Sequence, residues 1–275
     1  PAGTQVTGQV LLGGEDVLTM SWGRLRAVRW SAASIVFQGA MHALNAVQRI
    51  GKQVAEPIIL HEKVSAAEAE QRATELLRQV GLPEWRARSY PHELSGGQRQ
   101  RVMIAMALAC EPRLIVADEA TTALDVMIQA QVLELIRGLV AERGIALMMI
   151  SHDLSVLSST CERLAVMYAG RVVELGPAHE VFTDPRHPYS EALSAAFPVV
   201  GDTAARGRPR GLGGDPPDPT ELPPGCPFRP RCPVAVSACQ ETDVELAPLD
   251  TEGLRHSACL RVQAGDLTTL AGSSA

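Results

Sequence analysis

The chain has 275 residues, of which 46% are hydrophobic and 20% are charged, and its formal net charge is -6. This composition is that of a globular protein with one sizeable core. The negative charge argues against a broad nucleic-acid-binding surface, so we expect no nucleic-acid partner. No apolar run approaches the roughly 18–20 residues that a membrane-spanning helix needs. We therefore expect any membrane role to be peripheral, and the lack of a recognisable signal peptide favours the cytoplasm.

The hydrophobic pattern predicts strands and helices in alternation. Strands are expected at 6–12, 34–38, 114–117 and 145–150, helices at 65–80, 97–109 and 128–143, and a hairpin at 164–175. Ser65 and Glu68 form a capping-box pattern ahead of the first helix, and Gly81 lies where its C-cap belongs. The apolar runs at 114–117 and 145–150 are typical of strands buried on both faces of a parallel sheet. Together these elements predict an α/β fold with right-handed crossovers.

The composition changes after residue 197. Seven prolines and six glycines fall within residues 198–225, which predicts an extended linker. A small cysteine-containing module is expected at 226–262, and the small, polar residues 263–275 are expected to form a flexible tail.

Two adjacent carboxylates, Asp118 and Glu119, close the apolar run at 114–117. Ligands of open α/β sheets bind at the carboxyl ends of the strands. One carboxylate there can hold Mg²⁺, and the next can orient or deprotonate an attacking water. Taken alone, the pattern fits ordinary solvated acids at a strand end equally well.

A second pattern, Leu94-Ser95-Gly96-Gly97-Gln98, opens the predicted helix at 97–109. Its glycines let a ligand approach the backbone closely, and the free N–H groups of a helix N-terminus attract phosphate. A simple N-cap is the alternative. The continuation through Arg99 and Gln100 to Arg101 argues against it.

These segments resemble, in order and spacing, four motifs of the ABC ATPases. Residues 94–101 resemble the signature motif, residues 118–125 the Walker B motif and D-loop, Gln38 the Q-loop glutamine and His152 the switch histidine. The resemblance covers about residues 1–262. It implies an ABC-type P-loop ATPase core at 1–197, with an inserted helical subdomain at about 39–101.

The resemblance implies that two such ATPase subunits pair head to tail and enclose ATP and Mg²⁺. In the chain's own site, Glu119 would act on the attacking water and His152 would contact the γ-phosphate. Asp118 would support Mg²⁺, and Gln38 would link the metal site to the helical subdomain.

The same resemblance gives the chain a second role, toward the nucleotide held by its partner. The signature residues that would contact that nucleotide are Ser95, Gly96, Gly97 and Gln98. Asp125 would lie at the dimer seam.

One motif of the family does not occur in the sequence. A Walker A loop needs G-x-x-x-x-G-K-[ST], and the nearest match, Gly51-Lys52, is followed by Gln53. Residues 1–6 resemble family sequence that lies shortly after this loop, so we expect the upstream part to be missing. These 275 residues are then expected to bind ATP weakly in their own site and to be inactive alone.

Further segments narrow the resemblance to the ATPases of dipeptide, oligopeptide and nickel importers. They are Tyr90-Pro91-His92-Glu93, His187-Pro188-Tyr189 and the run from Gly225 to Cys232. The resemblance implies peptide import, driven from the cytoplasmic face of the membrane. The implied partners are a second ABC ATPase subunit, two permease subunits and, indirectly, an extracytoplasmic substrate-binding protein. Import of nickel or another small solute is the alternative.

Four cysteines lie close together near the C-terminus: Cys226, Cys232, Cys239 and Cys259. Four thiolates can hold an iron–sulfur cluster or a tetrahedral Zn²⁺. The lack of C-x-x-C pairs weighs against zinc, and disulfides are disfavoured in a reducing cytoplasm. The resemblance makes a [4Fe–4S] cluster the first choice, with four metal-free thiols as the alternative.

Two rival functions remain open at the level of sequence. A soluble ABC ATPase of DNA repair or translation is one, but such proteins usually carry long coiled-coil or duplicated-domain insertions. A non-catalytic subunit that supplies only its signature face is the other. The presence of Glu119 and His152 argues against it, and the absence of a Walker A sequence favours it.

Overall fold

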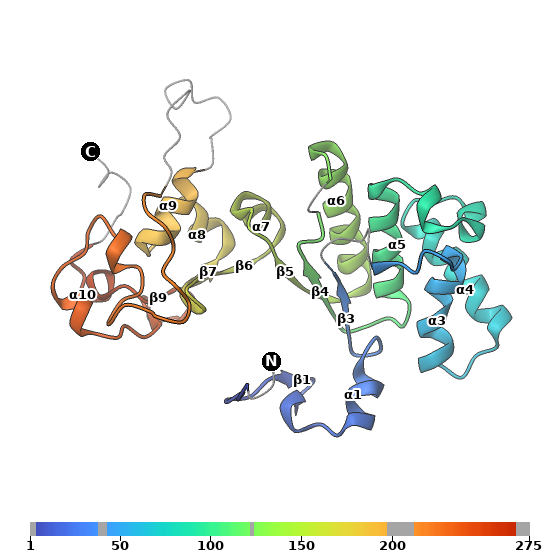
Figure 1. The fold of residues 1–275 in the computed structure, drawn as a ribbon, viewed down its shortest axis with the longest axis horizontal. Coiled ribbons are helices and arrows are strands. Elements are labelled where there is room, and N and C mark those ends of the chain that lie inside the picture. The colour runs from blue at the N-terminus through green and yellow to red at the C-terminus, as the bar shows by residue number, and fades with distance from the viewer. Residues whose placement is uncertain (1–3, 38–42, 122–123, 197–211, 268–275) are drawn as a thin grey trace. The chain divides into compact units, whose positions relative to one another are not determined.

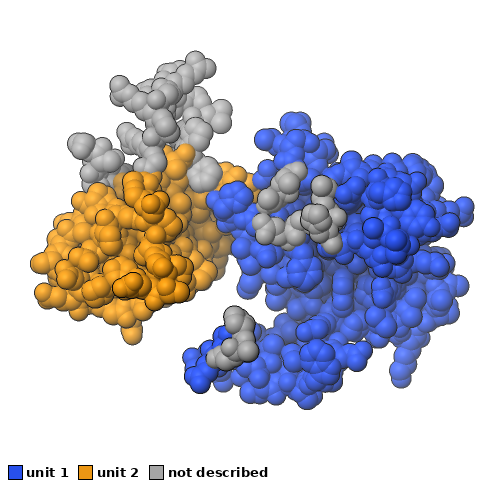
Figure 2. All heavy atoms as spheres, in the orientation of Figure 1, with its two compact units in different colours: residues 1–152 blue, residues 153–275 orange. Residues whose placement is uncertain are grey.

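The computed structural model describes residues 4–37, 43–121, 124–196 and 212–267 (Figure 1). The chain divides into two units, residues 1–152 and 153–275 (Figure 2). No helix in the described part of the chain is long and apolar enough to cross a membrane.

The first unit contains short N-terminal elements, a parallel sheet and a group of helices. Its elements are β1 Leu11–Leu12, β2 Glu15–Asp16, η1 Val17–Thr19, α1 Trp22–Val28, β3 Ala33–Val36, α3 Ile50–His61, α4 Ala66–Gln79, η2 Glu84–Arg88, η3 Pro91–Glu93, α5 Gly96–Leu108, β4 Leu114–Asp118, α6 Val126–Arg143 and β5 Ala146–Ile150.

The sheet of the first unit has the order β3-β4-β5, and both pairings are parallel. Val36 lies beside Ala117, and Asp118 lies beside Ile150, so the three carboxyl ends meet at one edge. The segments that follow the strands, including the predicted site residues, therefore leave the sheet from the same side. The α/β prediction is confirmed.

Two details of the strand predictions are wrong. Residues 145–150 were expected to be buried on both faces, but Met148 and Ile150 of β5 are 54% and 49% exposed. The reason is that β5 is an edge strand, with β4 as its neighbour within the described residues. The strand expected at 6–12 is short: only Leu11–Leu12 pairs with β2, across the turn at Gly13 and Gly14.

Helices α3, α4 and α5 share a core of fully buried apolar side chains: Ile50, Val54, Ile58, Leu77 and Val102. Helix α4 begins as expected, with the hydroxyl of Ser65 accepting a hydrogen bond from Glu68 N. Gly81 follows the helix with φ 76°, a conformation that glycine adopts without strain. These packed helices hold the start of α5 in place.

The second unit is built on an antiparallel sheet. Its elements are α7 Leu154–Thr160, β6 Arg163–Tyr168, β7 Arg171–Pro177, α8 Ala178–Thr183, α9 Pro188–Ala196, η4 Arg229–Arg231, α10 Ala238–Glu241, β8 Ala247–Pro248, β9 His256–Ser257 and α11 Leu260–Gln263.

The strand order in the second unit is β6-β7-β9-β8. The predicted hairpin is confirmed as β6 and β7, which turn at Ala169 and Gly170 with φ 50° and 78°. Strand β9, from the cysteine-containing module, pairs with the free side of β7 through Glu174 and Leu175. The module is therefore part of the same sheet as the hairpin.

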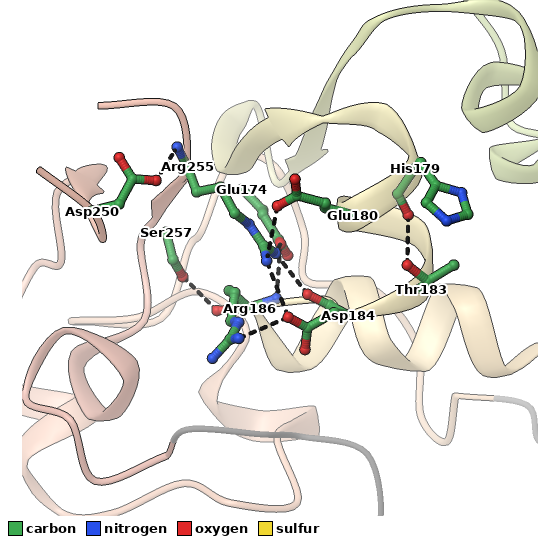
Figure 3. Close-up of polar contacts among 9 residues, drawn as sticks. All are labelled: Glu174, His179, Glu180, Thr183, Asp184, Arg186, Asp250, Arg255 and Ser257. Carbon is green, nitrogen blue, oxygen red and sulfur yellow. Dashed lines mark hydrogen bonds and ion pairs between the residues drawn. The ribbon is translucent and has the colours of Figure 1, made fainter. Parts of the chain in front are cut away.

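A buried ionic network joins the module to the hairpin and to the segment after α8 (Figure 3). Glu174 is fully buried, and its Oε1 accepts hydrogen bonds from Arg186 N at 2.7 Å and from the Arg255 guanidinium at 3.2 Å. The Arg255 guanidinium also donates to the Asp184 carboxylate at 3.2 Å and to the backbone carbonyl oxygen of Asp184 at 2.6 Å. The Ser257 hydroxyl donates to Arg186 O at 2.6 Å. Three separate segments are thus bound to one another around one buried carboxylate.

Candidate active site

The carboxyl edge of the parallel sheet carries the predicted acidic pair. Asp118 is the last residue of β4 and lies beside Ile150 of β5. Glu119 follows with φ 49°, and its N–H still donates to Ile150 O at 2.9 Å. A residue with a side chain is uncommon in this left-handed region, and such strain is found preferentially at functional sites.

The carboxylate of Glu119 contacts His152, which follows β5 after one residue. Glu119 Oε1 accepts a hydrogen bond from His152 N at 3.0 Å and lies 2.8 Å from His152 Nδ1, and Oε2 lies 3.0 Å from the same nitrogen. The Glu119 side chain is 17% exposed, whereas that of His152 is 79% exposed. The backbone N–H of His152 thus orients the mostly buried carboxylate of Glu119, and the exposed imidazole of His152 lies beside that carboxylate.

The Glu119–His152 pair is arranged in a way that suits general acid–base catalysis. A carboxylate held by two hydrogen bonds at a strand end can accept a proton from a water molecule within hydrogen-bond distance. Asp118, the preceding residue, supplies the oxygen ligand type that Mg²⁺ prefers. The structure therefore brings together three of the predicted site residues at the sheet edge.

A second group forms around the start of α5. Ser95 is its N-cap: the hydroxyl accepts a hydrogen bond from Gln98 N at 3.3 Å, and Gln98 Oε1 accepts one from Ser95 N at 3.1 Å. Asp125 caps α6 in the same way, accepting from Ile128 N at 3.0 Å. A β-carbon placed on Gly97 would lie 2.6 Å from Ile128 Cγ2, so the two helix starts pack closely. Gln38, the remaining residue of the predicted nucleotide site, lies outside the described residues.

Gly97→Ala is expected to destabilise the first unit by about 1–3 kcal/mol, because a methyl group there overlaps the Ile128 side chain. Gly96→Ala is the matched control, since its β-carbon would lie at an ordinary 3.6 Å from Leu124. Denaturant unfolding of both variants measures the difference. Ile128→Ala combined with Gly97→Ala should recover part of the loss, and equal stability of the two glycine variants would contradict the packing.

The four cysteines of the C-terminal module line one small pocket. Burial raises the pKa of the Cys226 and Cys259 thiols, and it raises the pKa of Cys232 to about 11. Within the described residues, no group of three or more His, Cys, Asp or Glu side chains is arranged to hold a metal ion. The side-chain arrangement thus gathers the thiols without forming a ligand cage.

Two buried residues of the second unit were not expected from the sequence. Glu174 fits an ordinary strand, although a charged residue inside the run Val172-Val173-Glu174-Leu175 is a signal for a buried ionic partner. His187 served only as part of a motif, yet it is 2% exposed and accepts a hydrogen bond from Tyr189 N at 3.1 Å through Nδ1.

The burial of His187 predicts a pH-dependent stability. Burial lowers the pKa of His187 to about 3, so the unfolded chain binds this proton more tightly than the folded unit does. Its contribution is fully present above pH 6.5 and is lost as the pH falls from 6.5 toward 3, by up to about 1.4 kcal/mol per pH unit. Unfolding measured from pH 7 to pH 4 should show a shallower slope for His187→Gln. His179→Gln, at an exposed position, should keep the original slope; the same slope for all three would contradict the assignment.

Comparison with known proteins agrees with these features. The family model "ABC transporter" matches residues 3–122, and the model "Oligopeptide/dipeptide transporter, C-terminal region" matches residues 173–239. A Brucella abortus (strain 2308) protein named for peptide import and ATP binding is 45% identical over 238 residues, which are 86% of this chain and 71% of the relative. A similarly named Brucella melitensis biotype 1 protein is 44% identical over 269 residues, which are 93% of this chain and 78% of the relative.

Solved structures show the same fold. The dimeric ATP-binding cassette MJ0796 bound to ADP and Pi has a TM-score of 0.57 and 30% identity, covering 62% of this chain and 74% of the other. The cbiO1 subunit of Clostridium perfringens has a TM-score of 0.56 and 29% identity, covering 64% and 68%. The fold is thus that of an ABC ATPase cassette. The chain belongs to the ABC transporter family, as an ATP-binding subunit of its peptide-importer branch.

Proposed function

We propose that this chain hydrolyses ATP at the cytoplasmic face of the membrane to energise the import of peptides. The contact between Glu119 and His152 at the carboxyl edge of the sheet carries the proposal, because it is an arrangement for activating water. The names of the relatives, which refer to peptide import, support the substrate class.

In the proposed mechanism, Glu119 accepts the proton of the attacking water, and His152 contacts the γ-phosphate from the solvent side. Asp118 would hold Mg²⁺, which would supply positive charge beside the phosphates. Gln38, which lies outside the described residues, would have the role of linking this metal site to the helical subdomain. The 275 residues contain no G-x-x-x-x-G-K-[ST] sequence, so the mechanism assigns to this chain only the groups that it contains.

We propose that a second ABC ATPase subunit completes the site, head to tail, as a two-subunit arrangement supported by the dimeric MJ0796 cassette. The start of α5 would face the partner's nucleotide with Ser95, Gly96, Gly97 and Gln98. Asp125 would lie at the seam, beside the same helix start. Two permease subunits would be driven by the conformational change of the ATPase subunits. An extracytoplasmic binding protein would deliver the peptide.

This proposal assigns a role to each part of the chain. Residues 1–197 form the ATPase part, with the helical subdomain at about 39–101, and residues 198–225 connect it to the cysteine module at 226–262. Residues 263–275 form the tail.

Reconstitution of the assembled transporter in lipid vesicles tests the function. ATP-dependent uptake of a labelled dipeptide is the expected result. Uptake of nickel or another small solute without peptide uptake would overturn the substrate class. Unchanged uptake with Glu119→Gln would instead show that this chain supplies only its signature face.

We also propose that the four cysteines hold an iron–sulfur cluster, since all four line one pocket and four thiolates are a common ligand set for such clusters. The described side chains do not form a cage for a metal ion, so the thiolates would have to rearrange to hold the cluster. When bound, it would cross-link the module. Anaerobically purified protein should contain iron and acid-labile sulfide, and Cys232→Ser should lose both while Cys110→Ser keeps them. Iron-free protein with four titratable thiols in the module would refute the cluster.

A further inference from the structure

The second unit contains a cavity of about 330 Å³ that the ATPase mechanism does not use. Strand β7, the segment 243–246 and the start of the cysteine module form its walls. The apolar lining comes from Val173, Phe228, Val244, Leu246 and Ala258. This volume is at the lower end of the range for ligand pockets and suits a small molecule better than a nucleotide.

A side-chain hydrogen-bond donor lies in the wall of the cavity. His187 lines it, and its Nδ1 accepts from Tyr189 N, so the proton of the neutral ring is on Nε2. Among the described residues this Nε2–H has no hydrogen-bond acceptor. The His187 residue is only 2% exposed, but its Nε2 atom is itself accessible, so a ligand oxygen in the cavity can accept a hydrogen bond from it.

Charges of both signs lie at the opening. Arg171 and Asp243 form an ion pair there, with side chains 52% and 63% exposed, and Glu245 is an exposed second acid. An ion pair this exposed contributes little to the free energy of folding. A charged ligand group can therefore replace Arg171 or Asp243 as the partner of the other at small cost. Opposite charges at one opening are complementary to a molecule that itself carries both charges.

We propose that this cavity binds a short peptide of dipeptide size through its two charged ends and its amide carbonyl. The α-carboxylate pairs with Arg171, and the α-ammonium pairs with Asp243 and Glu245. The amide carbonyl accepts from His187 Nε2, and one apolar side chain lies against Phe228. A free amino acid has the two charges but lacks the amide carbonyl, so it does not make this hydrogen bond to His187 Nε2.

Calorimetric titration of the full chain with Ala-Val dipeptide, N-acetyl-Ala-Val, Ala-Val amide and free valine tests the site. The binding assignment does not rest on the transport function, because it is measured without ATP or permeases. Saturable 1:1 binding of the dipeptide is expected. Removing either charge, or the amide carbonyl, should weaken binding about tenfold or more.

Variants show which side chain binds the carboxylate end of the dipeptide and which side chains bind its ammonium end. Arg171→Gln should abolish the preference for the dipeptide over its amide, and Asp243→Asn with Glu245→Gln should abolish the preference over the N-acetyl form. Ala258→Leu should fill the cavity and remove binding. Arg163→Gln, an exposed arginine on the neighbouring strand β6, is the matched control and should change nothing.

Three results would overturn the proposal. They are no saturable binding of the dipeptide, equal binding of all four ligands, and an unchanged preference for the carboxylate in Arg171→Gln. Circular dichroism of each variant establishes that the unit is folded, so loss of binding reports on the site.

Discussion

Glu119→Gln is expected to lower ATP hydrolysis by the assembled transporter about 10²–10⁴-fold, which is the usual contribution of a positioned general base. The amide keeps the size of the side chain and can still accept from His152 N, so the loop with φ 49° at this position should be retained. Proton acceptance is what the variant removes. Single-turnover hydrolysis measures the chemical step separately from product release.

Glu134→Gln, at an exposed position on α6, is the matched control and should hydrolyse ATP at the original rate. Nucleotide binding should be little changed in Glu119→Gln. Hydrolysis within a factor of about three of the control would exclude Glu119 as the base, since such a difference is far below the expected contribution.

Arg255→Ala is expected to destabilise the second unit by about 3–5 kcal/mol, because it leaves Glu174 buried with its ionic partner removed. Burial, the largest cause, already raises the pKa of Glu174, against the hydrogen bond from Arg186 N and the charge of Arg255. The folded unit therefore binds this proton more tightly than the unfolded chain. Stability from Glu174 is present below its usual pKa of 4.5 and is lost as the pH rises toward the raised value.

The cost of Arg255→Ala should therefore be larger at pH 8 than at pH 5, and denaturant unfolding at both values measures it. Glu174→Gln combined with Arg255→Ala should recover part of the stability, because the double variant no longer buries a charge. Arg163→Ala, which removes an exposed arginine from β6, is the control. A cost that is equal at both pH values and is not relieved by Glu174→Gln would show that Arg255 acts through packing alone.

Much of the first unit follows from local sequence. The apolar run at 114–117 and the capping pattern at Ser95 depend on neighbouring residues, and both elements form within one or two residues of the expected positions. The order of the motifs was enough to single out Glu119 and His152. Their direct contact was not predicted, because it depends on the register of β4 against β5 and on the left-handed backbone of Glu119.

The second unit was less predictable, because its structure depends on contacts between distant residues. Strands β8 and β9 have two residues each, which is too short for any period to be visible. The partners of Glu174 lie on the segment after α8 and next to β9. The exposure of β5 was missed for a related reason: an apolar run gives no indication of whether a strand lies in the middle of a sheet or at its edge.

The pairing of β9 with β7 has a consequence for synthesis of the protein on the ribosome. Glu174 lies opposite Ser257, so roughly eighty residues must be made after β7 before its second partner strand emerges. At a synthesis rate of about 5–20 residues per second, the edge of β7 that pairs with β9, including Glu174, stays unpaired for on the order of 4–16 seconds. The hairpin β6–β7 can form early, but its sheet closes only after β9 has been made. The C-terminal module thus sets the time at which the second unit finishes folding.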